Sequence, residues 1–138
     1  MKITIHQPLY IFEIGQRANQ EDSLYPTGEK ATSEDRLFVL CDGMGGHERG
    51  EVASQTVCKA LGNWFSDNED TSQPLTDNQL LAAIEYAYNA LDTKDNGGIK
   101  KMGTTLTLLY IHARGITAAH IGDSRIYHIH PGVGVLYQ

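Results

Sequence analysis

The chain has 138 residues, which suits a single domain that buries roughly two-thirds of its unfolded surface. An apolar fraction of 41% and a charged fraction of 20% are ordinary for a globular protein. The formal net charge of -6 argues against nucleic acid and an anionic membrane as partners, because both bind clustered lysine and arginine.

The N-terminal segment, residues 3–14, mixes β-branched and aromatic residues and predicts one or two strands. His6, Pro8 and Glu13 interrupt its apolar stretches, so the segment is typical of neither a signal peptide nor a transmembrane span. We therefore expect a cytoplasmic location. Further along the chain, the stretch YPTGEKATSED at 25–35 has the composition of a loop.

A short apolar run at 36–41 predicts a buried strand, and the segment behind it, DGMGGHERG, is rich in glycine. Beyond that segment apolar residues recur every three or four positions up to Trp64. This period predicts an amphipathic helix that ends near Asp67. Thr76 and Gln79 form a T-x-x-Q capping box, which predicts the start of a second helix that ends before an Asn-Gly-Gly triplet.

The last third of the chain is strand-like. Runs at 104–111, 116–121 and 125–130 are joined by short turns and predict an antiparallel meander. Because strands and helices are segregated along the chain, we predict the α+β class.

The two cysteines, Cys41 and Cys58, both lie in apolar surroundings. We interpret them as buried free thiols rather than as a disulfide framework. No Cys/His cluster has the spacing of a zinc site.

Acidic residues stand at three element boundaries: the pair Glu21–Asp22, then Asp42, then Asp123. If these boundaries meet in space, their mutual repulsion favours a hard cation with oxygen ligands, Mg²⁺ or Mn²⁺, between them. Asp42 could then bridge two metals, and Gly43 could offer its carbonyl. Taken singly, each acid also has a plain interpretation as a turn or solvated loop residue.

The combination resembles a known family. The segment DGMGGHERGEVAS at 42–54 is similar to the signature of the metal-dependent serine/threonine protein phosphatases, the PPM or type 2C family, in its bacterial form. Arg17 with Glu21–Asp22 resembles the first motif of that family, MGTT at 102–105 its GTT strand start, and IGDSRIY at 121–127 its GDSR motif. The motifs occur in the family's order. The resemblance therefore makes residues 1–138 the N-terminal part of one phosphatase domain.

The resemblance implies a β-sandwich flanked by helices, with the metals at one end of the sandwich and the fold incomplete at the C-terminus. It implies hydrolysis of phosphoserine and phosphothreonine by metal-activated water, with no phospho-enzyme. Two or more Mg²⁺ or Mn²⁺ ions would serve each complete site. The implied partners are a phosphorylated protein substrate and an opposing serine/threonine kinase.

The resemblance also implies roles for individual residues. Asp42 would be the bridging metal ligand, Gly43 would offer its carbonyl, and Arg17 would grip the substrate phosphate with its planar fork. Arg17 and Asp42 would thus carry the catalysis. The metal ligands implied in full are Glu21, Asp22, Asp42, Gly43 and Asp123.

Two positions depart from the family pattern. Met44 stands where many eukaryotic members carry a histidine that acts as general acid, and Gln20 stands where an asparagine is common. His47 lies three residues beyond Met44, so we interpret it as a loop or helix N-terminal residue. A metal-bound water could protonate the leaving oxygen instead.

Two later family motifs, each with a metal-binding aspartate, would lie beyond Gln138. A truncated phosphatase domain with little or no activity alone is the favoured interpretation. A natural half-domain and self-association through exposed strand edges stay open. The alternative function is a non-catalytic phosphatase-like module that regulates or binds phosphoproteins. Nucleotide binding by the glycines is disfavoured, because no G-K-[ST] follows and Asp42 would repel phosphate.

Overall fold

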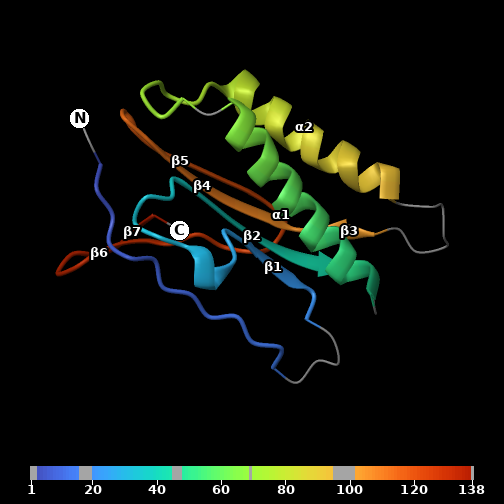
Figure 1. Ribbon diagram of the computed structural model, residues 1–138. Helices are drawn as coiled ribbons and strands as arrows, with labels where there is room; N and C mark the ends of the chain where they lie inside the picture. The colour runs from blue at the N-terminus through green and yellow to red at the C-terminus, as the bar shows by residue number, and fades with distance from the viewer. Residues whose placement is uncertain (1–2, 16–19, 45–47, 69, 95–101, 138) are drawn as a thin grey trace.

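A computed structural model describes residues 3–15, 20–44, 48–68, 70–94 and 102–137 of the chain (Figure 1). A twisted antiparallel sheet occupies the middle of the molecule. Helices α1 (Glu48–Asn68) and α2 (Asp77–Lys94) lie together over one face of it, and the N-terminal segment runs along the other side. The predicted α+β class is confirmed. In the described part of the chain, no helix combines the length and apolar character that crossing a membrane requires.

The main sheet has the strand order β1-β2-β4-β5, with a short strand β3 beside the end of β2. All its pairs are antiparallel. The strands are β1 (Asp22–Tyr25), β2 (Leu37–Met44), β3 (Gly103–Thr104), β4 (Leu106–His112) and β5 (Gly115–Ile121). A 3₁₀ helix, η1 (Gly28–Lys30), connects β1 to β2. A separate two-stranded sheet is formed by β6 (His128–His130) and β7 (Gly134–Tyr137).

Both predicted helices are present. α1 ends at Asn68, one residue beyond the predicted end. At the start of α2 the capping box forms as predicted: Thr76 N donates to Gln79 Oε1 at 2.9 Å, and Gln79 N donates to Thr76 Oγ1 at 3.1 Å. These two bonds give side-chain acceptors to two backbone N–H groups, which lack backbone partners at the start of a helix.

The hydrophobic core lies between the helices and the sheet. Along β2, buried and less buried residues alternate, so that Val39 and Cys41 face α1. α1 contributes Ala53, Val57 and Leu61, and all three are fully buried. The same alternation places Leu40 and Asp42 on the opposite face of the sheet.

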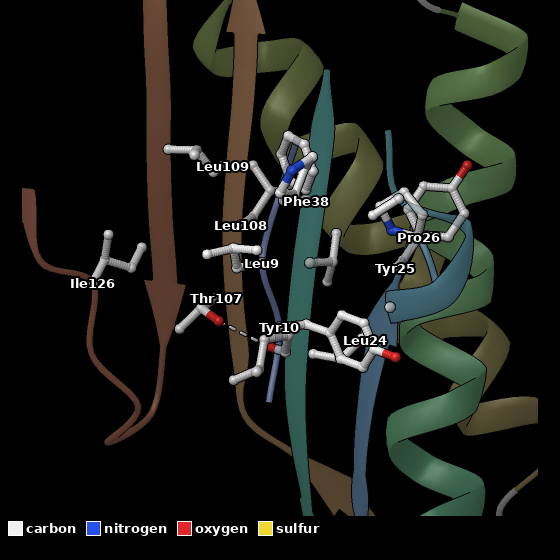
Figure 2. A pocket seen from close by; sticks show the side chains of 15 residues that line it. Leu9, Tyr10, Leu24, Tyr25, Pro26, Phe38, Thr107, Leu108, Leu109 and Ile126 are labelled. Carbon is white, nitrogen blue, oxygen red and sulfur yellow. Dashed lines mark hydrogen bonds between the residues drawn. The ribbon is translucent and has the colours of Figure 1, made fainter. Parts of the chain in front are cut away.

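That opposite face is only thinly covered. A cavity of about 230 Å³ lies there, lined by Leu9 and Tyr10 of the N-terminal segment, by strand residues such as Leu40, and by Ile126 (Figure 2). The N-terminal segment crosses the face loosely, since Leu9 is 95% exposed and Ile11 is 85% exposed.

Two strand predictions are wrong. Residues 3–14 have no regular structure, because a strand needs a hydrogen-bonded neighbour and no described strand pairs with them. In the predicted strand at 125–130 only His128–His130 is extended, and it pairs with β7 rather than with β5. The meander therefore ends at Ile121.

Candidate metal centre

Two predicted metal ligands face each other across the β1–β2 pair. Asp22 stands directly opposite Asp42 in the register, so both side chains project from the same face of the sheet. Both residues are partly buried. Like charges directly opposite each other in a sheet are unfavourable, and a cation between them would relieve the repulsion.

Gly43 brings the first turn of α1 against this strand end. Its N–H donates to the carbonyl of Glu21 at 2.9 Å. A Cβ atom on Gly43 would lie 1.9 Å from the carbonyl oxygen of Gly50, so only glycine permits this approach. A Cβ on Gly50 would in turn lie 3.0 Å from Glu21 Oε2. The Glu21 carboxylate is thus held beside the N-terminal turn of α1, where the helix dipole favours an anion.

Thr105 links Asp42 to the loop that carries Asp123. The Asp42 N–H donates to Thr105 Oγ1 at 3.0 Å, and the Thr105 N–H donates to the Asp42 carbonyl at 2.9 Å. Thr105 Oγ1 also lies 3.1 Å from Ser124 Oγ, within hydrogen-bonding distance. The MGTT and GDSR motifs, far apart in the sequence, therefore meet at the backbone of Asp42.

A comparison with protein-family models identifies the family of this chain. The family described as "Protein phosphatase 2C" matches residues 13–136. The chain belongs to the protein phosphatase 2C family.

Named relatives agree with this. The type 2C chain is 39% identical over 118 residues to the serine/threonine protein phosphatase PstP of Mycobacterium tuberculosis, which covers 84% of this chain and 21% of PstP. It is 32% identical over 118 residues to the protein phosphatase PhpP of Streptococcus pneumoniae, covering 83% of this chain and 46% of PhpP.

Solved structures show the same fold. The crystal structure of the M. tuberculosis phosphatase PstP/Ppp superposes with a TM-score of 0.68 at 32% identity, over 99% of this chain and 52% of that one. The PstP catalytic domain in complex with two manganese ions gives a TM-score of 0.66 at 32% identity, over 98% of this chain and 53% of that one. The type 2C chain thus has the PPM phosphatase fold and spans about half the length of these structures.

Glu21, Asp22, Asp42 and Gly43 lie at the same end of the β1–β2 pair of this type 2C chain, and their roles as metal ligands stay predictions. Asp123 is exposed on the loop that Thr105 joins to Asp42. Among the described residues, no group of three or more His, Cys, Asp or Glu side chains is arranged to hold a metal ion. Arg17 and His47 lie outside the described residues, so their predicted roles stay predictions.

Sequence reasoning missed the contacts of two motif residues, Thr105 and Gly50. In the sequence, Thr105 is identifiable only as part of the GTT strand start, and Gly50 only as one of several glycines. A signal was present, since buried hydroxyls need a hydrogen-bond partner and a glycine near a helix start favours close backbone approach. Neither signal names the partner, which is distant in the sequence.

Cys41 of β2 and Cys58 of α1 are buried and free, as predicted. A hydrogen bond with the Cys41 side chain, together with burial, raises the pKa of the Cys58 thiol far above its ordinary value. The Cys58 thiol is therefore neutral, and it donates to the Ser23 carbonyl at 3.4 Å. Both thiols belong to the core rather than to the metal centre.

Proposed function

We propose that this chain forms part of a metal-dependent protein serine/threonine phosphatase site, which hydrolyses phosphoserine and phosphothreonine. The observation that carries the proposal is the placement of Asp22 opposite Asp42 at the end of a strand pair in a type 2C chain. Two carboxylates on one face, beside a helix start and a tight glycine contact, form a negatively charged end of the sheet that suits divalent cations.

The proposed cofactors are Mg²⁺ or Mn²⁺, with two or more ions in a complete site. The donor set fits such hard cations, because Asp22, Asp42 and Glu21 offer carboxylate oxygens and Gly43 offers a carbonyl. Asp42 would bridge the metals, with Asp123 serving an additional one. When bound, such ions lower the pKa of a coordinated water and neutralise charge on a transferring phosphoryl group.

Phosphate recognition is assigned to Arg17. A guanidinium group offers a planar fork of N–H donors that matches two phosphate oxygens at once. Arg17 would orient the substrate phosphate beside Asp42, and these two residues are the proposed catalytic pair. Their relative geometry is a prediction, because Arg17 lies outside the described residues.

The described residues supply only part of the ligand set, since no group of three metal-binding side chains occurs among them. The chain also spans 46% of PhpP and 52% of the PstP/Ppp structure. We therefore expect the complete site to need acids from elsewhere, and the 138-residue chain alone to show little or no activity.

The test is Mn²⁺-dependent hydrolysis of p-nitrophenyl phosphate by a polypeptide that joins this chain to the rest of a type 2C domain. Asp42→Asn should abolish the metal-dependent rate by removing the bridging carboxylate. Asp92→Asn, an exposed position on α2, is the matched control and should retain it. Full activity of Asp42→Asn would exclude Asp42 as the bridging ligand.

A non-catalytic phosphoprotein-binding module is the second candidate, and the incomplete set of acids among the described residues favours it. This module would bind a phosphopeptide with Arg17 but leave it intact. Binding without phosphate release, measured on the 138-residue chain and lost in Arg17→Ala, would support this function over catalysis.

The proposed substrates are phosphorylated proteins in the cytoplasm, in opposition to a serine/threonine kinase. Self-association is proposed through the open edges of the sheet, because β1 and β5 stand at the two ends of the strand order. Sedimentation at several concentrations would test that association.

A further inference from the structure

Thr105 lies beside the candidate metal centre and is 4% exposed, and both its hydroxyl and its methyl group contact other residues there. Its hydroxyl accepts the Asp42 N–H at 3.0 Å and pairs with the Ser124 hydroxyl at 3.1 Å. A hydroxyl has one donor hydrogen and two acceptor lone pairs, so it can serve both partners together. Thr105 is therefore the junction between the Asp42 backbone and the Asp123 loop.

The methyl group of Thr105 contacts the other side of the same loop. Gly122 has φ +99°, and a Cβ atom there would lie 2.8 Å from Thr105 Cγ2. The glycine thus both adopts a conformation that other residues avoid and lets the loop close down on the methyl group. Valine would keep this packing and lose the hydroxyl, whereas serine would do the reverse.

The geometry points to Thr105 as a positioning residue for the metal centre: its hydroxyl couples the placement of Asp42 to that of Asp123. This inference rests on the proposed function. The Thr105 N–H also donates to the Asp42 carbonyl at 2.9 Å, so both the N–H and the carbonyl of Asp42 are hydrogen-bonded to Thr105. A carboxylate whose backbone cannot shift presents its oxygens to a cation without a further ordering cost.

The test titrates Mn²⁺ into a ¹⁵N-labelled polypeptide that joins this chain to the rest of a type 2C domain. It follows paramagnetic broadening of the backbone amide signals of Asp42 and Asp123. Thr105→Val should raise the Mn²⁺ concentration at half-broadening by roughly tenfold or more at both residues, as for outer-shell partners of metal ligands. Thr105→Ser should stay close to wild type because it keeps the hydroxyl. Ser124→Ala should raise the midpoint at Asp123 more than the midpoint at Asp42.

Equal midpoints in Thr105→Val and the wild type would overturn the positioning role. A Thr105→Ser midpoint as high as that of Thr105→Val would also overturn it, because packing rather than the hydroxyl would then be responsible. If Thr105→Val fails to fold, the Mn²⁺ midpoints at Asp123 in Ser124→Ala and Thr105→Ser are compared instead. A higher midpoint in Ser124→Ala supports the positioning role, and equal midpoints overturn it. Absence of broadening in the wild type at millimolar Mn²⁺ would instead reject the proposed metal centre itself, and the inference with it.

Discussion

Asp22 stands directly opposite Asp42 across the β1–β2 pair, so the end of the sheet carries two carboxylates on one face. Like charges directly opposite each other in a sheet are generally unfavourable, and binding of a cation between them would relieve the repulsion and stabilise the folded chain. The stability of the isolated chain therefore reports on the site even where activity is absent.

The first prediction concerns that carboxylate pair. Asp42→Asn should raise the free energy of unfolding of the metal-free chain by about 0.5 kcal/mol, because it removes one of two facing charges. It should also abolish stabilisation by Mn²⁺. Urea denaturation with and without Mn²⁺ measures both effects, with Asp92→Asn as control. An Asp42→Asn variant that Mn²⁺ stabilises as strongly as the wild type would contradict this prediction.

The second prediction compares alanine substitutions at Gly43 and Gly50, two glycines whose backbones approach closely. Gly43→Ala should destabilise the chain by about 3 kcal/mol, since its Cβ would lie 1.9 Å from the backbone carbonyl oxygen of Gly50, which cannot move aside. Gly50→Ala should cost far less, because its Cβ would meet the flexible Glu21 side chain and alanine favours the helix. Thermal unfolding of the two variants gives the comparison, and similar losses in both would refute it.

The third prediction concerns the start of α2. Thr76→Ala should lower the free energy of unfolding by about 1 kcal/mol, because Gln79 N loses its capping oxygen. Gln79→Ala should cost less, and the double variant should cost less than the sum of both, since the two bonds form one reciprocal unit. Thr76→Ser is the matched control and should retain the wild-type stability within error, because it keeps the capping hydroxyl.

The fourth prediction concerns pH. Tyr88 donates its hydroxyl to the Thr104 carbonyl at 3.0 Å, and burial, with a smaller effect of Cys41, raises the pKa of Tyr88 to about 12. In the unfolded chain the phenol ionises near its ordinary value of 10.0. The folded state thus holds the proton more tightly, and the stabilisation is complete below pH 10 and lost as pH rises towards 12.

The matched variant is Tyr88→Phe, which lacks the ionisable group. The difference in unfolding free energy between the wild type and Tyr88→Phe should be about 1 kcal/mol near neutral pH, from the lost hydrogen bond. The difference should shrink between pH 10 and 12. A difference that stays constant over this range would show that Tyr88 does not titrate with folding.

Much of the fold follows from local signals. The T-x-x-Q box predicted the start of α2 because its two hydrogen bonds join residues three apart. The three- and four-residue period predicted α1 because one helix face must be buried. The motif residues Asp42 and Gly43 were recognised because the residue types and their order are themselves distinctive.

Residues 3–14 show where local signals fail. The segment has a strand-like composition, yet a strand forms only when a neighbouring chain supplies its hydrogen bonds, and no described strand does so. The strand prediction for residues 125–130 was wrong for a related reason. The part that is a strand, His128–His130, pairs with β7 rather than with the preceding strand β5.

The amino-acid sequence by itself determined the family, the helices and the acids of the candidate metal centre, because these depend on residue identity, spacing and order. Only the tertiary structure decided that Asp22 faces Asp42, that the Gly50 carbonyl packs closely against Gly43, and that Thr105 joins Asp42 to Ser124. Each of these is a contact between residues far apart in the chain, or a matter of register. Such contacts are set by how whole elements pack, and no local pattern encodes them.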